Sequence, residues 1–176
     1  MNRWKQLTGI GALLLAGCNS GETTGSIVYD EYEKAYNEIG EVTDFKETSE
    51  NYAISYEMVL NDDGTYTYCI IVDEPRISMY DVTVMAVEEG VGIQEKMMPS
   101  IGIFDGPYTM IPSQINREGG YVKGLAINGT TSQSPVVLRL LVEWEDSHGT
   151  AVTQEYYRIR LDENGVEYVP VEGEGA

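Results

Sequence analysis

Residues 52–72 read YAISYEMVLNDDGTYTYCIIV, and this stretch decides the fold. Between positions 52 and 60, large apolar residues alternate with smaller or polar ones, a period of two that indicates a half-buried β-strand. The next four residues, Asn61-Asp62-Asp63-Gly64, are of the types that tight turns require. A run rich in tyrosine, isoleucine and valine follows at positions 66–72. Two such runs joined by a short Asn/Asp/Gly segment predict a β-hairpin.

Strand signals recur along the rest of the chain. Further runs rich in β-branched and aromatic residues lie at positions 77–87, 121–127, 136–144 and 152–161. The last two are joined by Asp146-Ser147-His148-Gly149, a second hairpin signal. Short strands with polar turns and no intervening helix predict a mainly β fold, an antiparallel sandwich.

One helix is expected before the strands, at residues 27–39. Its apolar positions recur at spacings of three and four, and charged residues, Glu31, Glu33, Lys34 and Glu38, fill the opposite side. Gly40 follows as a stop signal. We expect this amphipathic helix to pack on the domain; the alternative is that it binds a partner.

The succession of strands resembles the immunoglobulin-like domains common on bacterial surfaces. The sequence lacks the cysteine pair and tryptophan spacing of antibody domains, so the resemblance is one of architecture. The expected fold class is therefore mainly β, an antiparallel immunoglobulin-like β-sandwich preceded by one short α-helix. Together they would form a single domain over residues 27–170.

The N-terminus carries a second resemblance. A basic start with Arg3 and Lys5 precedes an uncharged apolar run at residues 7–17, the layout of a secretory signal peptide. This run is too short to span a membrane as a helix, which takes about 20 apolar residues. It closes with Leu15-Ala16-Gly17-Cys18, which resembles the lipobox of bacterial lipoproteins.

That resemblance implies a lipid-anchored protein on the extracytoplasmic face of the cell membrane. In the family, a signal peptidase recognises the residues corresponding to Leu15, Ala16 and Gly17 and cuts before the cysteine. The sulfur of Cys18 would carry the acyl anchor. The expected segments are a signal peptide at 1–17, a lipidated flexible linker at 18–26 and a disordered tail at 171–176.

Composition excludes several function classes. The formal net charge is −18, from 11 Lys and Arg against 29 Asp and Glu, which argues against nucleic acid as a partner. A single histidine, His148, makes a histidine-rich metal site improbable. The sequence shows no nucleophile elbow, P-loop or dinucleotide fingerprint. We therefore expect no enzyme activity, no cofactor and no metal.

The leading hypothesis is a non-catalytic binding module of the cell envelope, with an envelope protein or a glycan as partner. The long apolar connection at residues 97–112 is expected to contain one or two short edge strands, at 100–104 and 108–111, since its prolines disfavour a central strand. This connection is also the expected contact region. The alternative is that its side chains cover the end of the sandwich core. The residues expected at the contact are Met97, Met98, Phe104, Tyr108 and Met110.

Two other functions stay open. A cation- or metal-binding accessory lipoprotein would use acidic turns such as Asp62-Asp63-Gly64, or the methionines. An envelope hydrolase would need a carboxylate pair, for which Glu143 and Glu145 beside Trp144 are the nearest candidates. Cys69 is expected to be a small buried residue of a strand, with a reactive thiol or an intermolecular disulfide as alternatives.

Overall fold

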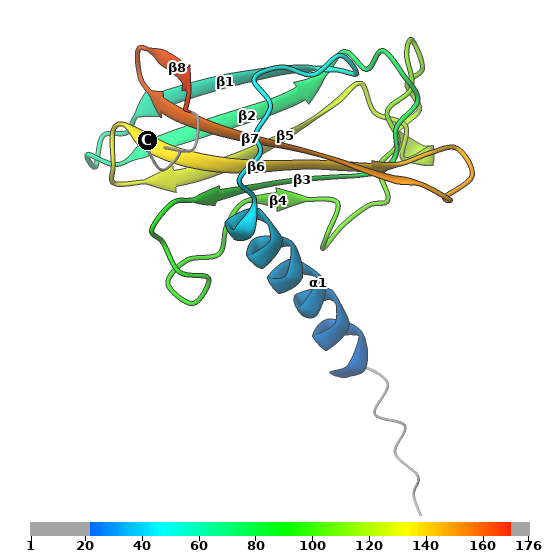
Figure 1. Cartoon of the computed structure of the whole chain (residues 1–176), viewed down its shortest axis with the longest axis horizontal. Coiled ribbons are helices and arrows are strands. Elements are labelled where there is room, and N and C mark those ends of the chain that lie inside the picture. The colour runs from blue at the N-terminus through cyan, green and yellow to red at the C-terminus, as the bar shows by residue number, and fades with distance from the viewer. Residues whose placement is uncertain (1–21, 170–176) are drawn as a thin grey trace, which may run out of the picture.

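The computed structural model describes residues 22–169 and is a two-layer β-sandwich preceded by one helix (Figure 1). The mainly β fold class is confirmed. The predicted signal peptide, residues 18–21 of the predicted linker and the predicted tail at 171–176 lie outside the described residues. The elements are α1 (Glu22–Glu41), β1 (Ala53–Leu60), β2 (Tyr66–Asp73), β3 (Tyr80–Glu88), β4 (Ser100–Ile101), a 3-10 turn η1 (Arg117–Gly119), β5 (Gly124–Thr131), β6 (Val136–Glu145), β7 (Val152–Asp162) and β8 (Gly165–Tyr168).

All ladders between these strands are antiparallel. One sheet has the order β1-β2-β5 and the other the order β4-β3-β6-β7-β8. Placing strands one, two and five opposite strands three, six and seven is the distribution found in immunoglobulin-like sandwiches. The fourth strand here joins the sheet of the third, whereas in antibody constant domains it joins that of the first.

The hairpin predicted from residues 52–72 is formed by β1 and β2, with Leu60 opposite Tyr66 at its turn end. Gly64 adopts a φ of 83°, and its N–H donates to the carbonyl oxygen of Asn61 at 3.1 Å. This left-handed conformation is open to glycine at little cost, which explains the residue there. The inward face includes Met58 and Tyr68, both buried. The alternation read from the sequence therefore places the hairpin correctly.

The main core lies between the two sheets. It is built from alternate residues of each strand, including Ile70 and Val72 of β2 and Leu138 and Leu140 of β6, all with no exposed surface. β6 is central to the five-stranded sheet and is buried on both faces for much of its length. Its inner residues face the hairpin, and its outer residue Leu141 faces α1.

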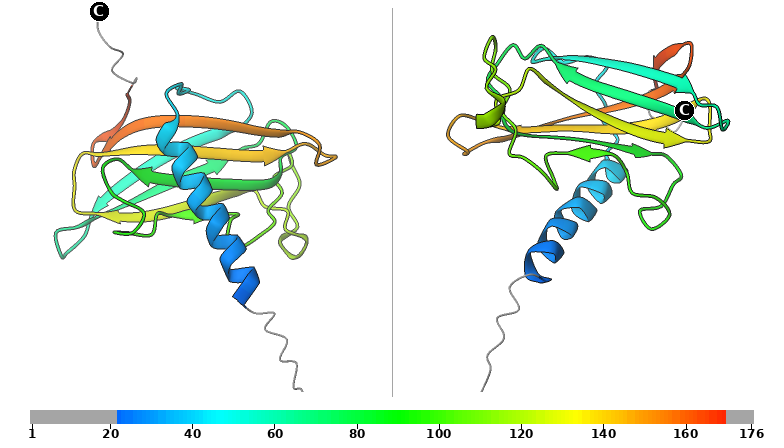
Figure 2. Two further views of the ribbon diagram at one scale, coloured as in Figure 1. Left: turned by 60° about the horizontal axis from the view of Figure 1, so that its bottom comes forward. Right: turned by 180° about the vertical axis from the view of Figure 1, so that it is seen from behind.

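Helix α1 lies across the outer face of the five-stranded sheet, and its N-terminal end projects away from the sandwich (Figure 2). A second apolar cluster joins Tyr32 and Ile39 of the helix to Met85 and Val87 of β3 and Leu141 of β6. Among the helix residues whose side chains are described, from Val28 onward, only those from Tyr32 on contribute to this cluster. The expectation that the helix packs on the domain is confirmed.

The helix is longer than the sequence predicts. It begins at Glu22 rather than at residue 27, so residues 22–26, assigned to a flexible linker, are helical. Gly25 and Ser26 are weak helix formers and suggested a linker. A helix that is already fixed by packing downstream extends upstream at low cost, because its nucleus is in place.

The strand predictions need four corrections. β3 begins at Tyr80 instead of residue 77, and β4 is only two residues long although a strand at 100–104 was expected. No strand forms at 108–111, where Met110 makes an isolated bridge to Met79. β8 was not predicted; it is only four residues long. No helix among the described residues has the length and apolar content needed to cross a membrane.

Candidate functional site

The predicted contact residues do not form one surface. Met97 and Phe104 are exposed, at 63% and 46%, and Tyr108 is half-buried. Met98 and Met110 are almost completely buried, at 1% and 0%, so their assignment to a contact surface is wrong. For these two methionines the alternative, that they cover the core, is the correct interpretation.

The physical reason lies in long-range pairing. The backbone N–H of Met98 donates to the hydroxyl oxygen of Tyr32 at 2.6 Å, and the Phe104 ring lies 5.3 Å from the Tyr32 ring, centroid to centroid. Met110 exchanges two backbone hydrogen bonds of 2.8 Å with Met79. Met98 and Phe104 therefore support α1, and Met110 closes the main core.

A different feature of the same connection forms a hollow. Between β4 and the start of β5, which are edge strands of the two different sheets, lies a pocket of about 340 Å³. We call it the edge pocket; it is lined by Ile101, Tyr108, Ile115, Val122, Lys123, Gly124, Leu125 and Ala126. Ile115 is 64% exposed and also borders two adjoining hollows. Most residues that line the edge pocket are apolar.

Lys123 sits at this pocket and at the neighbouring hollow near Glu74. It is exposed and forms no ion pair or hydrogen bond within the described part of the chain. Most other described cations are engaged: Lys34, Lys46, Lys96, Arg139 and Arg158 are in ion pairs, and Arg76 donates to backbone carbonyls. Lys123 is therefore a positive charge available at an apolar pocket.

Between α1 and the five-stranded sheet lies a groove of about 290 Å³ rich in carboxylates. Its acidic residues are Glu31, Glu38, Asp81, Glu143 and Glu145. Lys34 lies in it and pairs with Glu38 at 3.6 Å. Within residues 22–169, no group of three or more His, Cys, Asp or Glu side chains is arranged to hold a metal ion.

The acidic turns satisfy their own backbone. The Asp63 carboxylate accepts from the N–H and hydroxyl of Thr65. Asp162 accepts from the N–H groups of Asn164 and Gly165 at 2.7 and 3.1 Å. Asp146 does the same for its turn, and hydrogen bonds from the backbone and hydroxyl of Thr150 lower the pKa of Asp146 to about 2. The hydrogen bonds that these aspartates accept stabilise the turns and account for the aspartates without a bound ligand.

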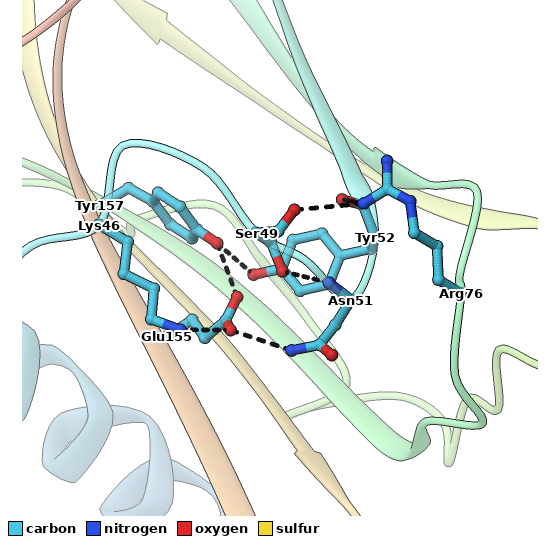
Figure 3. A network of polar contacts seen from close by, with 7 residues as sticks. All are labelled: Lys46, Ser49, Asn51, Tyr52, Arg76, Glu155 and Tyr157. Atoms are coloured by element: carbon cyan, nitrogen blue, oxygen red, sulfur yellow. Dashed lines mark hydrogen bonds and ion pairs between the residues drawn. The ribbon is translucent and has the colours of Figure 1, made fainter.

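A buried polar network centres on Glu155 of β7, which is 2% exposed (Figure 3). Oε1 accepts from Lys46 Nζ at 2.6 Å and from Asn51 Nδ2 at 3.1 Å. Oε2 accepts from the Tyr157 hydroxyl at 2.8 Å, which lies 2.7 Å from the Tyr52 hydroxyl. Burial acts to raise the pKa of Glu155, but side-chain hydrogen bonds, first of all the one from Lys46, outweigh burial and the pKa is lowered.

This network does not line any of the hollows described above. Lys46 and Asn51 come from the connection between α1 and β1, and the backbone N–H of Lys46 donates to the carbonyl oxygen of Tyr156 at 2.8 Å. Glu155 therefore fastens the connection to the edge of β7. Both carboxylate oxygens of Glu155 already accept hydrogen bonds, which fits a structural role.

A second charged group anchors the helix C-terminus. Arg139 donates to the Gly40 carbonyl oxygen at 2.7 Å and to Glu89 Oε1 at 2.6 Å. Arg158 donates to both oxygens of Glu89, at 2.7 and 2.9 Å. Hydrogen bonds from Arg158 and then Arg139 lower the pKa of Glu89 to about 2. The end of α1, whose carbonyl groups lack helical partners, is thus fixed to the sheet.

Cys69 lies on the outer face of β2 and is half-buried rather than buried, so the expectation for this residue is corrected. Partial burial and the opposite residue Glu57 raise the pKa of its thiol. The sequence pattern missed the outward orientation because the run at 66–72 is apolar on both faces.

Comparison with protein-family models, with curated proteins and with solved structures gave no match. Function is therefore argued from the residues alone. Ile115 and Lys123 lie just beyond the predicted contact region. An isolated apolar residue between Gln114 and Asn116 was the one signal that could have indicated Ile115.

Proposed function

We propose that this chain is a cell-envelope lipoprotein whose sandwich is a non-catalytic binding module, anchored through Cys18 on the extracytoplasmic face of the cell membrane. The lipobox residues Leu15-Ala16-Gly17-Cys18 support the anchor. Two acyl chains hold a protein on a membrane stably, since each buried methylene contributes about 0.8 kcal/mol.

The observation that carries the proposal is the placement of α1. The helix starts only four residues after Cys18, and its first half projects from the sandwich (Figure 1). At about 1.5 Å per residue, the helix covers about 15 Å between Glu22 and Tyr32, the first residue of the apolar cluster among those whose side chains are described. An anchored chain would thus hold its sandwich beyond the Debye length of about 8 Å.

Charge agrees with this arrangement. Cleavage before Cys18 removes Arg3 and Lys5, so the formal net charge becomes −20. Such a domain is repelled by anionic lipid headgroups at short range. A spacer that is helical rather than flexible keeps the repulsion small and leaves the loops of the sandwich open to partners.

Lipidation is tested with three full-length proteins in a bacterial host: wild type, Cys18→Ala and Cys69→Ala. We expect wild type and Cys69→Ala to lose residues 1–17, gain acyl groups by mass and partition with membranes. Cys18→Ala should be unacylated and uncleaved. Because Cys69 is the only other cysteine, it is the matched control. An unmodified Cys18 in a soluble wild-type protein would overturn the proposal.

A further inference from the structure

One edge of β5 has no ladder partner among the described residues. β5 pairs with β2 over eight consecutive residues without a bulge and is the last strand of its sheet. No described segment forms a ladder with its other edge. Exposed edges are commonly protected by lysine, proline or a bulge, and Gly124–Thr131 contains none of these. Alternate backbone groups of this strand therefore have no ladder partner among the described residues.

The two ends of that edge differ. Near its C-terminal end, Lys96 donates to the carbonyl oxygen of Thr130. Near its N-terminal end, Gly124, Leu125 and Ala126 line the edge pocket instead. An extended chain that paired with this part of β5 would run beside a hollow able to take one apolar side chain. Backbone pairing combined with side-chain pockets is how exposed sheet edges recognise peptides.

The charge at the pocket narrows the choice of peptide. Lys123 lies at the pocket without an ion-pair partner among the described residues, in a chain with a large excess of carboxylates. The ligand group that complements Lys123 beside an apolar pocket is a carboxylate next to an apolar side chain. One residue carries a carboxylate and an apolar side chain on the same Cα only when it is the last residue of a chain.

We infer that the β5 edge and the edge pocket bind the C-terminal segment of an extended peptide. The last apolar side chain occupies the pocket, and the terminal carboxylate pairs with Lys123. This inference rests on the binding role proposed above and specifies its partner, a protein with an exposed, apolar C-terminus.

The probes are two pools of fluorescent hexapeptides with Leu, Ile, Val or Phe at the last position and mixed residues elsewhere. One pool ends in a free carboxylate and the other in an amide. Each is incubated with the full-length protein purified in detergent, and the bound peptides are recovered by gel filtration and measured. We expect at least tenfold more recovery from the free-acid pool.

Two charge reversals give the matched comparison. Lys123→Glu should lower recovery at least tenfold, whereas Arg160→Glu should leave it unchanged. Both residues are exposed, and Arg160 lies on β7 in the other sheet. Circular dichroism confirms that each variant is folded.

Three results would overturn the inference: no recovery from either pool, equal recovery from both, or a peptide-free protein whose β5 edge is occupied by a second copy, seen as a dimer. If neither pool binds but Cys18 is acylated, the pocket assignment fails and the anchored module stands. If the free-acid pool binds but Cys18 is unmodified, the anchor fails and the pocket stands.

Discussion

The hydroxyl groups of Tyr52 and Tyr157, 105 positions apart in the chain, lie 2.7 Å from each other in the buried network of Glu155. Since the Tyr157 hydroxyl donates its proton to Glu155, Tyr52 must be the donor to Tyr157. The pair thus forms a directed chain of hydrogen bonds that ends on a carboxylate. The two tyrosines therefore contribute unequally to the stability of the network.

Tyr157→Phe should destabilise the fold more than Tyr52→Phe. Removing the Tyr157 hydroxyl leaves both Glu155 Oε2 and the Tyr52 hydroxyl without a partner, at about 1–3 kcal/mol for each buried group. Removing the Tyr52 hydroxyl leaves the Tyr157–Glu155 bond intact and should cost about 1 kcal/mol. Urea unfolding of the two variants measures the difference. Equal losses would contradict the directed chain.

Acid should weaken the attachment of the helix through Glu89. The pKa of Glu89 is lowered from 4.5 to about 2, so the ionised group stabilises the folded state above about pH 4.5. This contribution is lost as the pH falls from 4.5 towards 2. Glu89→Gln should therefore be less stable than wild type at pH 7, and the two stabilities should converge near pH 2. A constant difference between the two denaturation curves over this range would contradict the assignment.

The packing of α1 can be tested with two tyrosines of the same helix. Tyr32 is 1% exposed and Tyr29 is 41% exposed. Tyr32→Ala should cost about 3–5 kcal/mol, as for other large core side chains, and release the second half of the helix. Tyr29→Ala should change stability by only about 0.5 kcal/mol. Chemical unfolding gives the energies, and hydrogen exchange at residues 32–41 shows the release. Unchanged exchange in Tyr32→Ala would argue against the packing.

The Cys69 thiol should react slowly with iodoacetamide in the folded protein. Partial burial and, secondarily, the carboxylate of Glu57 raise its pKa, and the thiolate is the reactive form. In a Cys18→Ala background, we expect Glu57→Gln to accelerate alkylation at pH 8, and unfolding in urea to accelerate it further. A folded rate equal to the unfolded rate would contradict the raised pKa.

The fold was predictable because its signals are local. Each of these signals can be recognised within about ten residues: the alternation at 52–60, the turn at Asn61–Gly64, and the runs that form β6 and β7. Where a strand depends on distant partners, the prediction was poorer. Beyond the two-residue β4, the connection pairs only through isolated bridges, all between positions 109 and 121 or to Met79, and β8 pairs along the edge of β7.

The candidate site was less predictable for a related reason. An apolar residue in a loop is equally compatible with burial and exposure, and Met97 and Met98 have opposite outcomes at adjacent positions. Met98 is buried because its backbone pairs with Tyr32, 66 residues away. Likewise, Lys123 is a candidate binding residue because none of the described residues forms an ion pair with it. No sequence pattern records the absence of such a neighbour.

The attachment of α1 also determines how the molecule would respond to mechanical load. If the chain is tethered upstream of Glu22, a pull on the domain travels along the helix and first reaches Tyr32, then Tyr36 and the Arg139–Gly40 bond. These contacts would break one after another before any strand of the core bears tension. The helix would then detach from the sheet and lengthen the tether under load, while the sandwich stays folded.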